Sequence, residues 1–249
     1  MLFREKVALI TGGAAGFGRS FAESLASEGA RIVLLDIDET QNQRTAEILT
    51  AYGADCLPLS CDVSDEEGVN RCVELAAKAY GKIDILINNA GLHLSEYNKS
   101  FEELGSRAVR RLFDVNMMGV IHLSLACKKY LAIGKGNILN ISSISSIQPV
   151  SPYGVSKLCV RGLTIAFATQ FAASGIRVNS LSPGLIDTVS AMQDLPQEII
   201  RLCRDELQLV KRTGNTLDVV NAMLYLCSDR ASFVTGENLT ISGGYPLAI

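Results

Sequence analysis

The sequence has few of the residues that build metal centres or disulfide frameworks. It holds only two histidines among 249 residues, and its seven cysteines are odd in number and form no C-x-x-C pair. Zinc sites need clustered cysteine or histidine ligands, so we expect no metal. Scattered cysteines are typical of reduced and mostly buried thiols, and we therefore expect a cytoplasmic protein.

Long runs of one charge or of apolar residues are also missing. The net charge is -3, and the longest basic runs are pairs such as Arg110-Arg111 and Lys128-Lys129. This pattern leaves no electrostatic footprint for nucleic acid and no polybasic patch for a membrane. No apolar stretch reaches the ~20 residues of a membrane span, and the run over residues 7–10 is too short for a secretory signal.

What the sequence does have is a regular alternation of strand and helix patterns from end to end. This alternation predicts an α/β fold with a doubly wound parallel sheet and helices on both faces. A chain of this length suits one α/β domain, which would bury about three quarters of its unfolded surface. We find no linker, repeat or low-complexity tract, and we expect one domain over residues 1–249.

A glycine-rich turn near the N-terminus indicates a nucleotide site. An apolar strand pattern at residues 6–11 leads directly into the turn at 12–18, and a helical pattern follows at 19–28. Glycine lets the backbone approach a phosphate, and the helix start offers free N–H groups to it. Asp36 ends the next strand pattern, where a carboxylate binds the adenosine ribose hydroxyls. The alternative is a glycine turn in an ordinary α/β unit.

Tyr153 and Lys157 are one helical turn apart and form a candidate acid–base pair. A free phenol titrates near pH ~10, and a nearby cation lowers its pKa so that it can accept a proton. Ser143 follows an apolar run, where a hydroxyl at a strand end can steady a substrate oxygen. The alternative is an amphipathic helix with an outward lysine.

Together these motifs resemble the short-chain dehydrogenase/reductase family over nearly the whole chain. Further matches fall in the family's order: Asn88-Asn89-Ala90-Gly91, Asn116, Pro183-Gly184 with Thr188, and residues 233–236 through Gly243-Gly244. The resemblance implies a single-domain Rossmann-type fold of about seven strands. It also implies a homotetramer joined through long helices and C-terminal segments.

The resemblance assigns four catalytic residues. Tyr153 takes the alcohol proton, Lys157 lowers the pKa of Tyr153 and binds ribose hydroxyls, and Ser143 orients the substrate oxygen. Asn116 kinks its helix and holds a water that completes the proton path; structural bending alone is the alternative.

One feature departs from the family pattern. Ser143 and Tyr153 lie ten positions apart, whereas thirteen is usual. If the preceding strand ends later than expected, Ser145 or Ser146 takes the place of Ser143.

The resemblance also supplies the cofactor site. Asp62 is expected to hold the adenine amine, although it can equally be a turn or cap residue. Asn88 is expected to tie neighbouring strands together. Thr188 is expected to hold the nicotinamide carboxamide. The expected cofactor-binding residues are Gly12, Ala15, Gly16, Phe17, Gly18, Asp36, Ile37, Asp62, Val63, Asn89, Ala90, Gly91, Tyr153, Lys157, Pro183, Gly184, Ile186 and Thr188.

NAD is the expected cofactor. The carboxylate of Asp36 would repel the 2′-phosphate of NADP. Relatives that use NADP carry a basic residue at the positions held here by Ala15 and Ile37.

The implied reaction is hydride transfer between a secondary alcohol, or its ketone, and the nicotinamide. The alternatives are a 3-oxoacyl-thioester reductase and a non-catalytic NAD-binding subunit. Residues 189–212 are expected to form a substrate lid, or else to pack plainly on the sheet edge. The expected substrate pocket is lined by His93, Leu94, Ile144, Gln148 and Met192.

Overall fold

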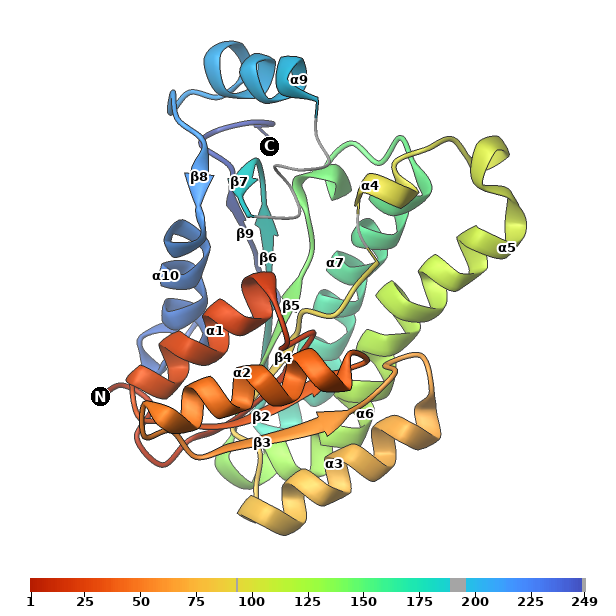
Figure 1. Cartoon of the computed structure of the whole chain (residues 1–249). Helices are drawn as coiled ribbons and strands as arrows, with labels where there is room; N and C mark the ends of the chain where they lie inside the picture. The colour runs from red at the N-terminus through yellow and green to blue at the C-terminus, as the bar shows by residue number, and fades with distance from the viewer. Residues whose placement is uncertain (93, 189–195, 248–249) are drawn as a thin grey trace.

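The computed structural model describes residues 1–92, 94–188 and 196–247, and its centre is a seven-stranded sheet. The strand order is β3-β2-β1-β4-β5-β6-β9, with every neighbouring pair parallel (Figure 1). The strands are β1 Val7–Thr11, β2 Arg31–Asp36, β3 Cys56–Ser60, β4 Ile85–Asn88, β5 Asn137–Ile141, β6 Arg177–Pro183 and β9 Asn238–Ile241. The predicted doubly wound α/β fold is confirmed.

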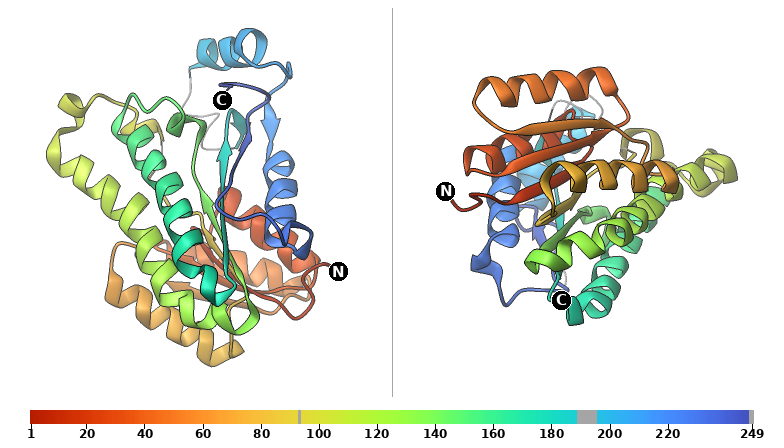
Figure 2. Two further views of the ribbon diagram at one scale, coloured as in Figure 1. Left: turned by 180° about the vertical axis from the view of Figure 1, so that it is seen from behind. Right: turned by 90° about the horizontal axis from the view of Figure 1, so that it is seen from below.

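Helices cover both faces of the sheet because successive side chains of each strand point to opposite faces. In β1, Ala8 and Ile10 pack under one helix layer, and Val7 and Leu9 pack under the other. The first layer consists of α1 Gly16–Ser27, α2 Glu39–Ala51 and α10 Thr216–Cys227. The second consists of α3 Glu66–Tyr80, α6 Gly119–Leu131 and α7 Pro152–Phe171 (Figure 2). Burial on both sides explains why the strands read as apolar runs.

The strand order reverses between β1 and β4. The chain winds from β1 towards β3 on one side and from β4 towards β9 on the other, which opens a crevice above the carboxyl ends of β1 and β4. Asn89 ties this switch point together, because its Nδ2 donates to the carbonyls of Thr11 and Gly12 at 3.0 and 3.1 Å. The turn after β1 and the turn after β4 are thereby joined.

The helical pattern over residues 101–130 is not one regular helix. Helix α5 Phe101–Phe113 passes into a π-helical turn at Asp114–Met118, and α6 follows. Asn116 lies within the π-helical turn, so the bend falls where an asparagine competes for backbone hydrogen bonds. Such π turns are frequent at functional sites.

Smaller elements gather beyond the carboxyl ends of the strands. The short α4 Leu94–Tyr97 lies there, and β7 Ile186–Asp187 pairs with β8 Gly214–Asn215. Helix α9 Gln197–Arg201 continues into a π-helical segment at Leu202–Leu207, and it lies at the same end of the molecule as the C-terminal segment (Figure 1). The first part of the expected lid, residues 189–195, lies outside the described residues.

The cysteines, the potential metal ligands and the helix lengths were compared with the expectations from the sequence. All seven cysteines lie in the described ranges and are free thiols, four of them buried. Among the described residues, no three potential metal ligands cluster. No helix in this part of the chain has the length and apolar character needed to cross a bilayer.

Candidate active site

A cleft of about 370 Å³ lies above the carboxyl ends of β1, β4, β5 and β6, and it brings most of the predicted site together. Predicted residues that line it are Gly12, Ala15, Gly16, Phe17, Asn89, Ala90, Gly91, Ser143, Tyr153, Lys157, Pro183, Gly184, Ile186 and Thr188. A second cavity of about 240 Å³ shares Gly12, Ala90 and Gly91 with this cleft and contains Asp36, Ile37, Asp62 and Val63. The shared lining residues make the two cavities neighbours along the ends of the strands.

The glycine turn is shaped for close approach of a phosphate. Gly16 has a φ of +53°, and a Cβ built there meets no atom within 4 Å, so this face of the turn is open. At Gly18, by contrast, a Cβ would clash with the carbonyl oxygen of Gly12, so only glycine lets α1 pack on the turn. Ala15 gives no side-chain cap to α1, which leaves the first-turn N–H groups for an anion. The turn fits a pyrophosphate.

Asp36 is fixed at the end of β2. Its Oδ2 accepts a hydrogen bond from the Ala14 N–H at 2.9 Å, and its Oδ1 accepts from the Asp38 N–H at 3.0 Å. The neighbouring Ile37 is 65% exposed and apolar. A carboxylate held in this way faces the second cavity, where the ribose hydroxyls of a nucleotide would lie.

Asp62 both closes a turn and lines the second cavity. Its Oδ1 accepts from the N–H and the hydroxyl of Ser64 at 2.9 and 2.6 Å, and its Oδ2 accepts from the Arg111 guanidinium at 3.1 Å. Partial burial alone would raise the pKa of Asp62, but the hydrogen bonds from Ser64 and Arg111 lower it below its ordinary value. The turn role that the sequence left open is therefore real, and the adenine role stays a prediction.

The sequence did not reveal how the Asp62 turn is held. Arg111 comes from α5 and also donates to the Ser64 hydroxyl at 2.6 Å, while His122 of α6 hydrogen-bonds to the Val63 carbonyl at 3.1 Å. Both contacts join residues far apart in the chain, so no local pattern could have identified them.

Tyr153 and Lys157 lie on the first turns of α7, as their spacing predicts. Pro152 occupies the start of the helix, and the Ser151 side chain accepts from the Gly154 N–H at 3.3 Å. The Lys157 Nζ lies 5.8 Å from the centroid of the Tyr153 ring and donates to the Ile141 carbonyl at 2.9 Å. The carbonyl at the end of β5 thus holds the amine beside the ring of Tyr153.

Burial dominates the electrostatics of this pair. The hydroxyl of Tyr153 lies in packed surroundings that raise its pKa to about 12, although a hydrogen bond with Ser143 works in the opposite direction. Burial lowers the pKa of the Lys157 amine to about 8. Desolvation of the phenolate outweighs the hydrogen bond with Ser143 here, and the expected lowering of the Tyr153 pKa by Lys157 stays a prediction.

Ser143 is the serine that reaches Tyr153. Strand β5 ends at Ile141, so Ser143 stands at the strand end, lines the cleft and hydrogen-bonds with the phenol. Its Oγ also accepts from the Ser145 N–H at 3.2 Å. Ser146 is 1% exposed and donates its hydroxyl to the Ser143 carbonyl at 2.6 Å. Neither Ser145 nor Ser146 lines the cleft.

Asn116 lies behind Lys157. Its Oδ1 accepts from the Leu92 N–H at 2.8 Å, and its Nδ2 donates to the Ser156 hydroxyl at 3.1 Å. A Cβ on Gly91 would lie 3.2 Å from the Asn116 Oδ1 and 3.4 Å from the Lys157 Nζ, so the three residues converge. The water-linked proton path through Asn116 stays a prediction. Asn88 ties strands as expected, since its Nδ2 donates to the Asn140 Oδ1 at 2.8 Å.

The expected substrate pocket is only partly described. His93, Met192 and the side chain of Leu94 lie outside the described part of the structure. Ile144 and Gln148 line neither the cleft nor the large cavity that adjoins it; from the same loop, Ile147 lines that cavity instead. Ile147 directly follows the short turn Ile144–Ser146.

Comparison with known proteins agrees with this geometry. A family model described as enoyl-(acyl carrier protein) reductase matches residues 12–246. Cyclohexanol dehydrogenase of Acinetobacter sp. (strain SE19) is 36% identical, with 98% of this chain and 96% of the relative covered. This chain belongs to the short-chain dehydrogenase/reductase family.

Other members of the family are similar over the same length. The cis-4-hydroxycyclohexanecarboxylate dehydrogenase of Sinomonas cyclohexanicum is 36% identical over 98% of this chain and 97% of its own length. A solved structure of 7α-hydroxysteroid dehydrogenase with NADH and 7-oxo glycochenodeoxycholic acid has a TM-score of 0.90 and 30% identity, covering 97% of this chain and 94% of that one. As a short-chain dehydrogenase/reductase, the protein is a nucleotide-binding oxidoreductase that uses a nicotinamide cofactor.

Proposed function

We propose that this protein oxidises a secondary alcohol on a carbon ring to the ketone, with NAD as the hydride acceptor. The observation that carries the proposal is the convergence of Ser143, Tyr153 and Lys157 in the cleft that the glycine turn also lines. The named activities of the similar proteins support the substrate class, because they concern cyclohexanol, a hydroxycyclohexane carboxylate and a hydroxysteroid.

The choice of NAD rests on the charges around the second cavity. A 2′-phosphate bound there would meet the carboxylate of Asp36, and burial beside a like charge is unfavourable. Arg111 is the basic side chain among the residues that line this cavity, and it is engaged by Asp62 and Ser64. No spare cation among these lining residues would compensate a 2′-phosphate.

The residues fit the dinucleotide along its length. Gly16 and the start of α1 would take the pyrophosphate, Asp36 the adenosine ribose, and Lys157 the ribose next to the nicotinamide. Gly184, the Ile186 backbone and Thr188 would orient the carboxamide. Bound NAD supplies the carbon that accepts the hydride and adds a positive charge to the cleft.

The chain's own residues handle the proton. Ser143 donates a hydrogen bond to the substrate oxygen and places it against the Tyr153 hydroxyl. Tyr153 in its phenolate form accepts the alcohol proton, and the Lys157 ammonium stabilises the phenolate. Because the two groups titrate as a pair, the pH dependence of turnover reports apparent pKa values of the pair rather than of either residue.

A reduction of acyl thioesters is the second candidate, because the matching family model is described as an enoyl-(acyl carrier protein) reductase. Such a reductase would prefer NADPH and would bind an anionic carrier group. One screen separates the two candidates: NAD and NADP with a panel of cyclic alcohols, and NADH and NADPH with a short 3-oxoacyl thioester and a short 2-enoyl thioester. The proposal requires NADH formation from a cyclic alcohol; thioester reduction with NADPH alone would replace it.

We also propose a homotetramer. Apolar side chains exposed on α7 and at the β9 edge support it, since Leu158 is 43%, Ile165 60% and Leu239 38% exposed. Exposed apolar side chains mark a subunit interface when they form one contiguous patch, as the proposal requires of these three.

A further inference from the structure

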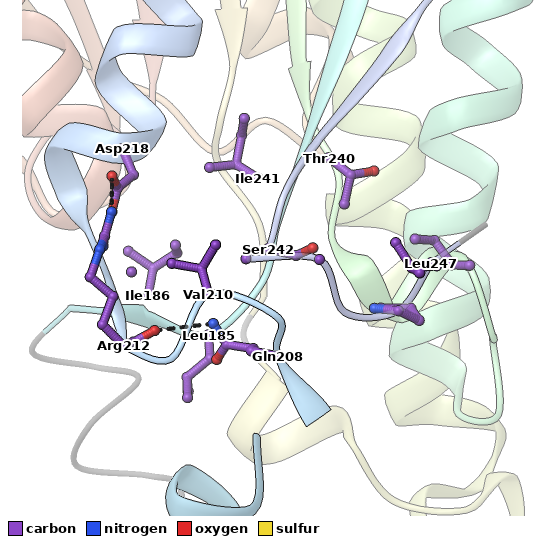
Figure 3. A pocket seen from close by; sticks show the side chains of 15 residues that line it. Leu185, Ile186, Gln208, Val210, Arg212, Asp218, Thr240, Ile241, Ser242 and Leu247 are labelled. Atoms are coloured by element: carbon purple, nitrogen blue, oxygen red, sulfur yellow. Dashed lines mark hydrogen bonds and ion pairs between the residues drawn. The ribbon is translucent and has the colours of Figure 1, made fainter. Parts of the chain in front are cut away.

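Leu185 and Ile186 line the cleft and also line a second cavity, of about 490 Å³. Both residues are buried, at 9% and 4% exposure. The second cavity is also lined by Arg212, Gly214 and Asp218, none of which lines the cleft. In Figure 3 a dashed line marks the contact between Arg212 and Asp218 at this cavity. Residues outside the cleft therefore lie behind one of its walls.

The backbone joins these residues to the cleft wall. Strand β7 pairs in parallel with β8, and Ile186 lies opposite Gly214. The Gly214 N–H donates to the Leu185 carbonyl at 3.0 Å. A Cβ on Gly214 would lie 2.5 Å from the Cδ1 of Ile186, so glycine lets the two strands approach this closely. A displacement of β8 is thus passed directly to the backbone at Leu185 and Ile186.

The cleft wall has two backbone supports of unequal strength. On one side the Gly184 N–H donates at 2.9 Å to the carbonyl of Ile241 in β9, which is a strand of the seven-stranded sheet. On the other side stands β8, which is two residues long and belongs to the separate two-stranded sheet. A pair of short strands has little stability of its own. Strand β8 therefore needs an anchor.

The start of α10 supplies this anchor. Asn215 and Asp218 form a capping box, in which the Asp218 side chain accepts from the Asn215 N–H at 2.8 Å and the Asn215 side chain accepts from the Asp218 N–H at 3.1 Å. Arg212, which precedes β8, donates to both oxygens of Asp218 at 2.7 and 2.8 Å. A bidentate pair fixes geometry as well as adding energy. Both ends of β8 are thereby held against α10.

The pair is ionised at neutral pH. The hydrogen bonds from Arg212 and from the Asn215 N–H lower the pKa of the Asp218 carboxyl to about 2. The buried face of α10 packs in the core against the sheet, so the helix that carries Asp218 is itself fixed. A continuous set of contacts thus runs from the core, through Asp218 and Arg212, to the wall of the cleft.

We propose that the Arg212–Asp218 pair positions the nicotinamide end of the cofactor, because it holds β8 against the Leu185 and Ile186 backbone. The inference rests on the proposed placement of the nicotinamide beside Ile186. Arg212 and Asp218 are positioning residues, since they act through β8 and line neither the cleft nor the cavity assigned to the adenosine. The pair should therefore affect one end of the dinucleotide and leave the other unchanged.

ADP-ribose is the probe that separates the two ends, because it keeps the adenosine, the pyrophosphate and the second ribose of NADH but lacks the nicotinamide. In Arg212→Met we expect the Kd for NADH to rise about three- to tenfold, the scale of one bidentate ion pair. The Kd for ADP-ribose should change by less than about twofold. Calorimetric titration measures both constants. Adding Asp218→Asn to Arg212→Met should weaken NADH binding no further, because the two changes break the same pair.

Two control variants separate positioning from a general loss of stability. Arg31→Met removes an exposed ion pair with Glu5 at the start of β2, which is the end of the sheet away from the cleft. Val219→Ala removes buried methyl groups from α10 and lowers the Tm. Both controls should leave the ratio of the two Kd values unchanged.

Three results overturn the inference: an unchanged Kd for NADH in Arg212→Met, an equal loss of ADP-ribose binding in that variant, or the same change of ratio in Val219→Ala. Failure of the proposed function gives a different result. If the native protein oxidises no cyclic alcohol, the proposed function fails, and the two binding constants still decide the role of the Arg212–Asp218 pair.

Discussion

At the residue scale, Lys157 is an amine in an unfavourable place. It is 6% exposed, and burial lowers its pKa from 10.5 to about 8. Because the folded pKa lies below the unfolded one, this group's favourable contribution is complete above pH ~10.5 and is lost as the pH falls to about 8. At neutral pH the folded protein therefore holds a charged amine at a cost of up to about 3 kcal/mol.

Lys157→Met is accordingly expected to stabilise the protein at pH 7 while abolishing turnover. The Ile141 carbonyl loses its hydrogen-bond donor, which removes about 1 kcal/mol of the gained stability. We therefore expect the free energy of unfolding to rise by about 1–2 kcal/mol. This corresponds to roughly 3–6 °C in Tm. Calorimetry at pH 7 and pH 10.5 measures this change in stability. Lys78→Met, at an exposed position of α3, is the control. A variant that is less stable than the native protein at pH 7, or a gain that grows with pH, contradicts the explanation.

Arg111 holds the Asp62 turn from outside, and its removal is expected to weaken NADH binding. Arg111→Met breaks the contacts with Asp62 and Ser64. An exposed ion pair contributes up to about 1 kcal/mol, and a hydrogen bond contributes about as much. We therefore expect the Kd for NADH to rise about three- to tenfold. Titration followed by NADH fluorescence measures the Kd. The adjacent Arg110→Met, whose side chain is exposed, is the control, and equal effects of the two changes would remove Arg111 from the nucleotide site.

At this scale the sequence was sufficient to place a residue in the cleft where its position follows from the local pattern. Ser143 was identifiable because it follows a buried strand, and Tyr153 with Lys157 because they are one turn apart. Arg111 was not identifiable, since its partners are brought together only by the tertiary fold. The burial that raises the pKa of Tyr153 was not identifiable for the same reason: the neighbouring charge of Lys157 is visible in the sequence, but the packing around the phenol is not.

At the scale of elements, the packing of α1 on the glycine turn controls the nucleotide site. Gly18→Ala places a methyl group against the Gly12 carbonyl, so α1 must shift. We expect a loss of stability of about 1–3 kcal/mol, as for other overpacked positions, together with a clear loss of NADH binding. Urea unfolding and NADH titration measure the two effects.

Gly162→Ala is the matched control for this change. Gly162 lies inside α7, and a Cβ there meets nothing within 4 Å. Alanine in a helix interior is favoured over glycine by about 1 kcal/mol, so this variant is expected to be more stable and to bind NADH normally. If both glycine changes lower stability and NADH binding to the same extent, the close approach of Gly18 to Gly12 does not explain the loss.

Element boundaries were harder to predict than element types. The periodicity over residues 101–130 indicated helix throughout, but a π-helical turn adds a residue to the backbone ladder without altering the apolar pattern enough to be recognised. The asparagine in its middle was the available signal. Likewise, the turn at Ile144–Ser146 moved Ile147, rather than Ile144, into the cavity wall.

At the scale of the whole molecule, the alternation of strands and helices predicted the parallel sheet, because buried parallel strands leave a strong apolar signal. The order of the strands does not follow from alternation, and the reversal between β1 and β4 is known only from the structure.

The homotetramer is tested on the exposed face of α7. Ile165 is 60% exposed, and Ile165→Lys places a charge in the proposed interface, so we expect smaller assemblies at the same protein concentration. Size-exclusion chromatography with light scattering measures the mass. Tyr52→Lys, at an 88% exposed position after α2, should leave the assembly unchanged. A native protein that is monomeric throughout the accessible concentrations contradicts the proposed assembly.

The central claim is that the Tyr153 hydroxyl moves the substrate proton, and one comparison tests it most directly. In Tyr153→Phe the ring beside Lys157 is kept and only the hydroxyl is removed. Steady-state oxidation of the best cyclic alcohol and NADH binding are measured on the same preparation. We expect kcat to fall by about 10²- to 10⁴-fold, the usual contribution of a general base, while the Kd for NADH changes by less than about twofold. Oxidation at a rate close to that of the native protein would contradict the claim.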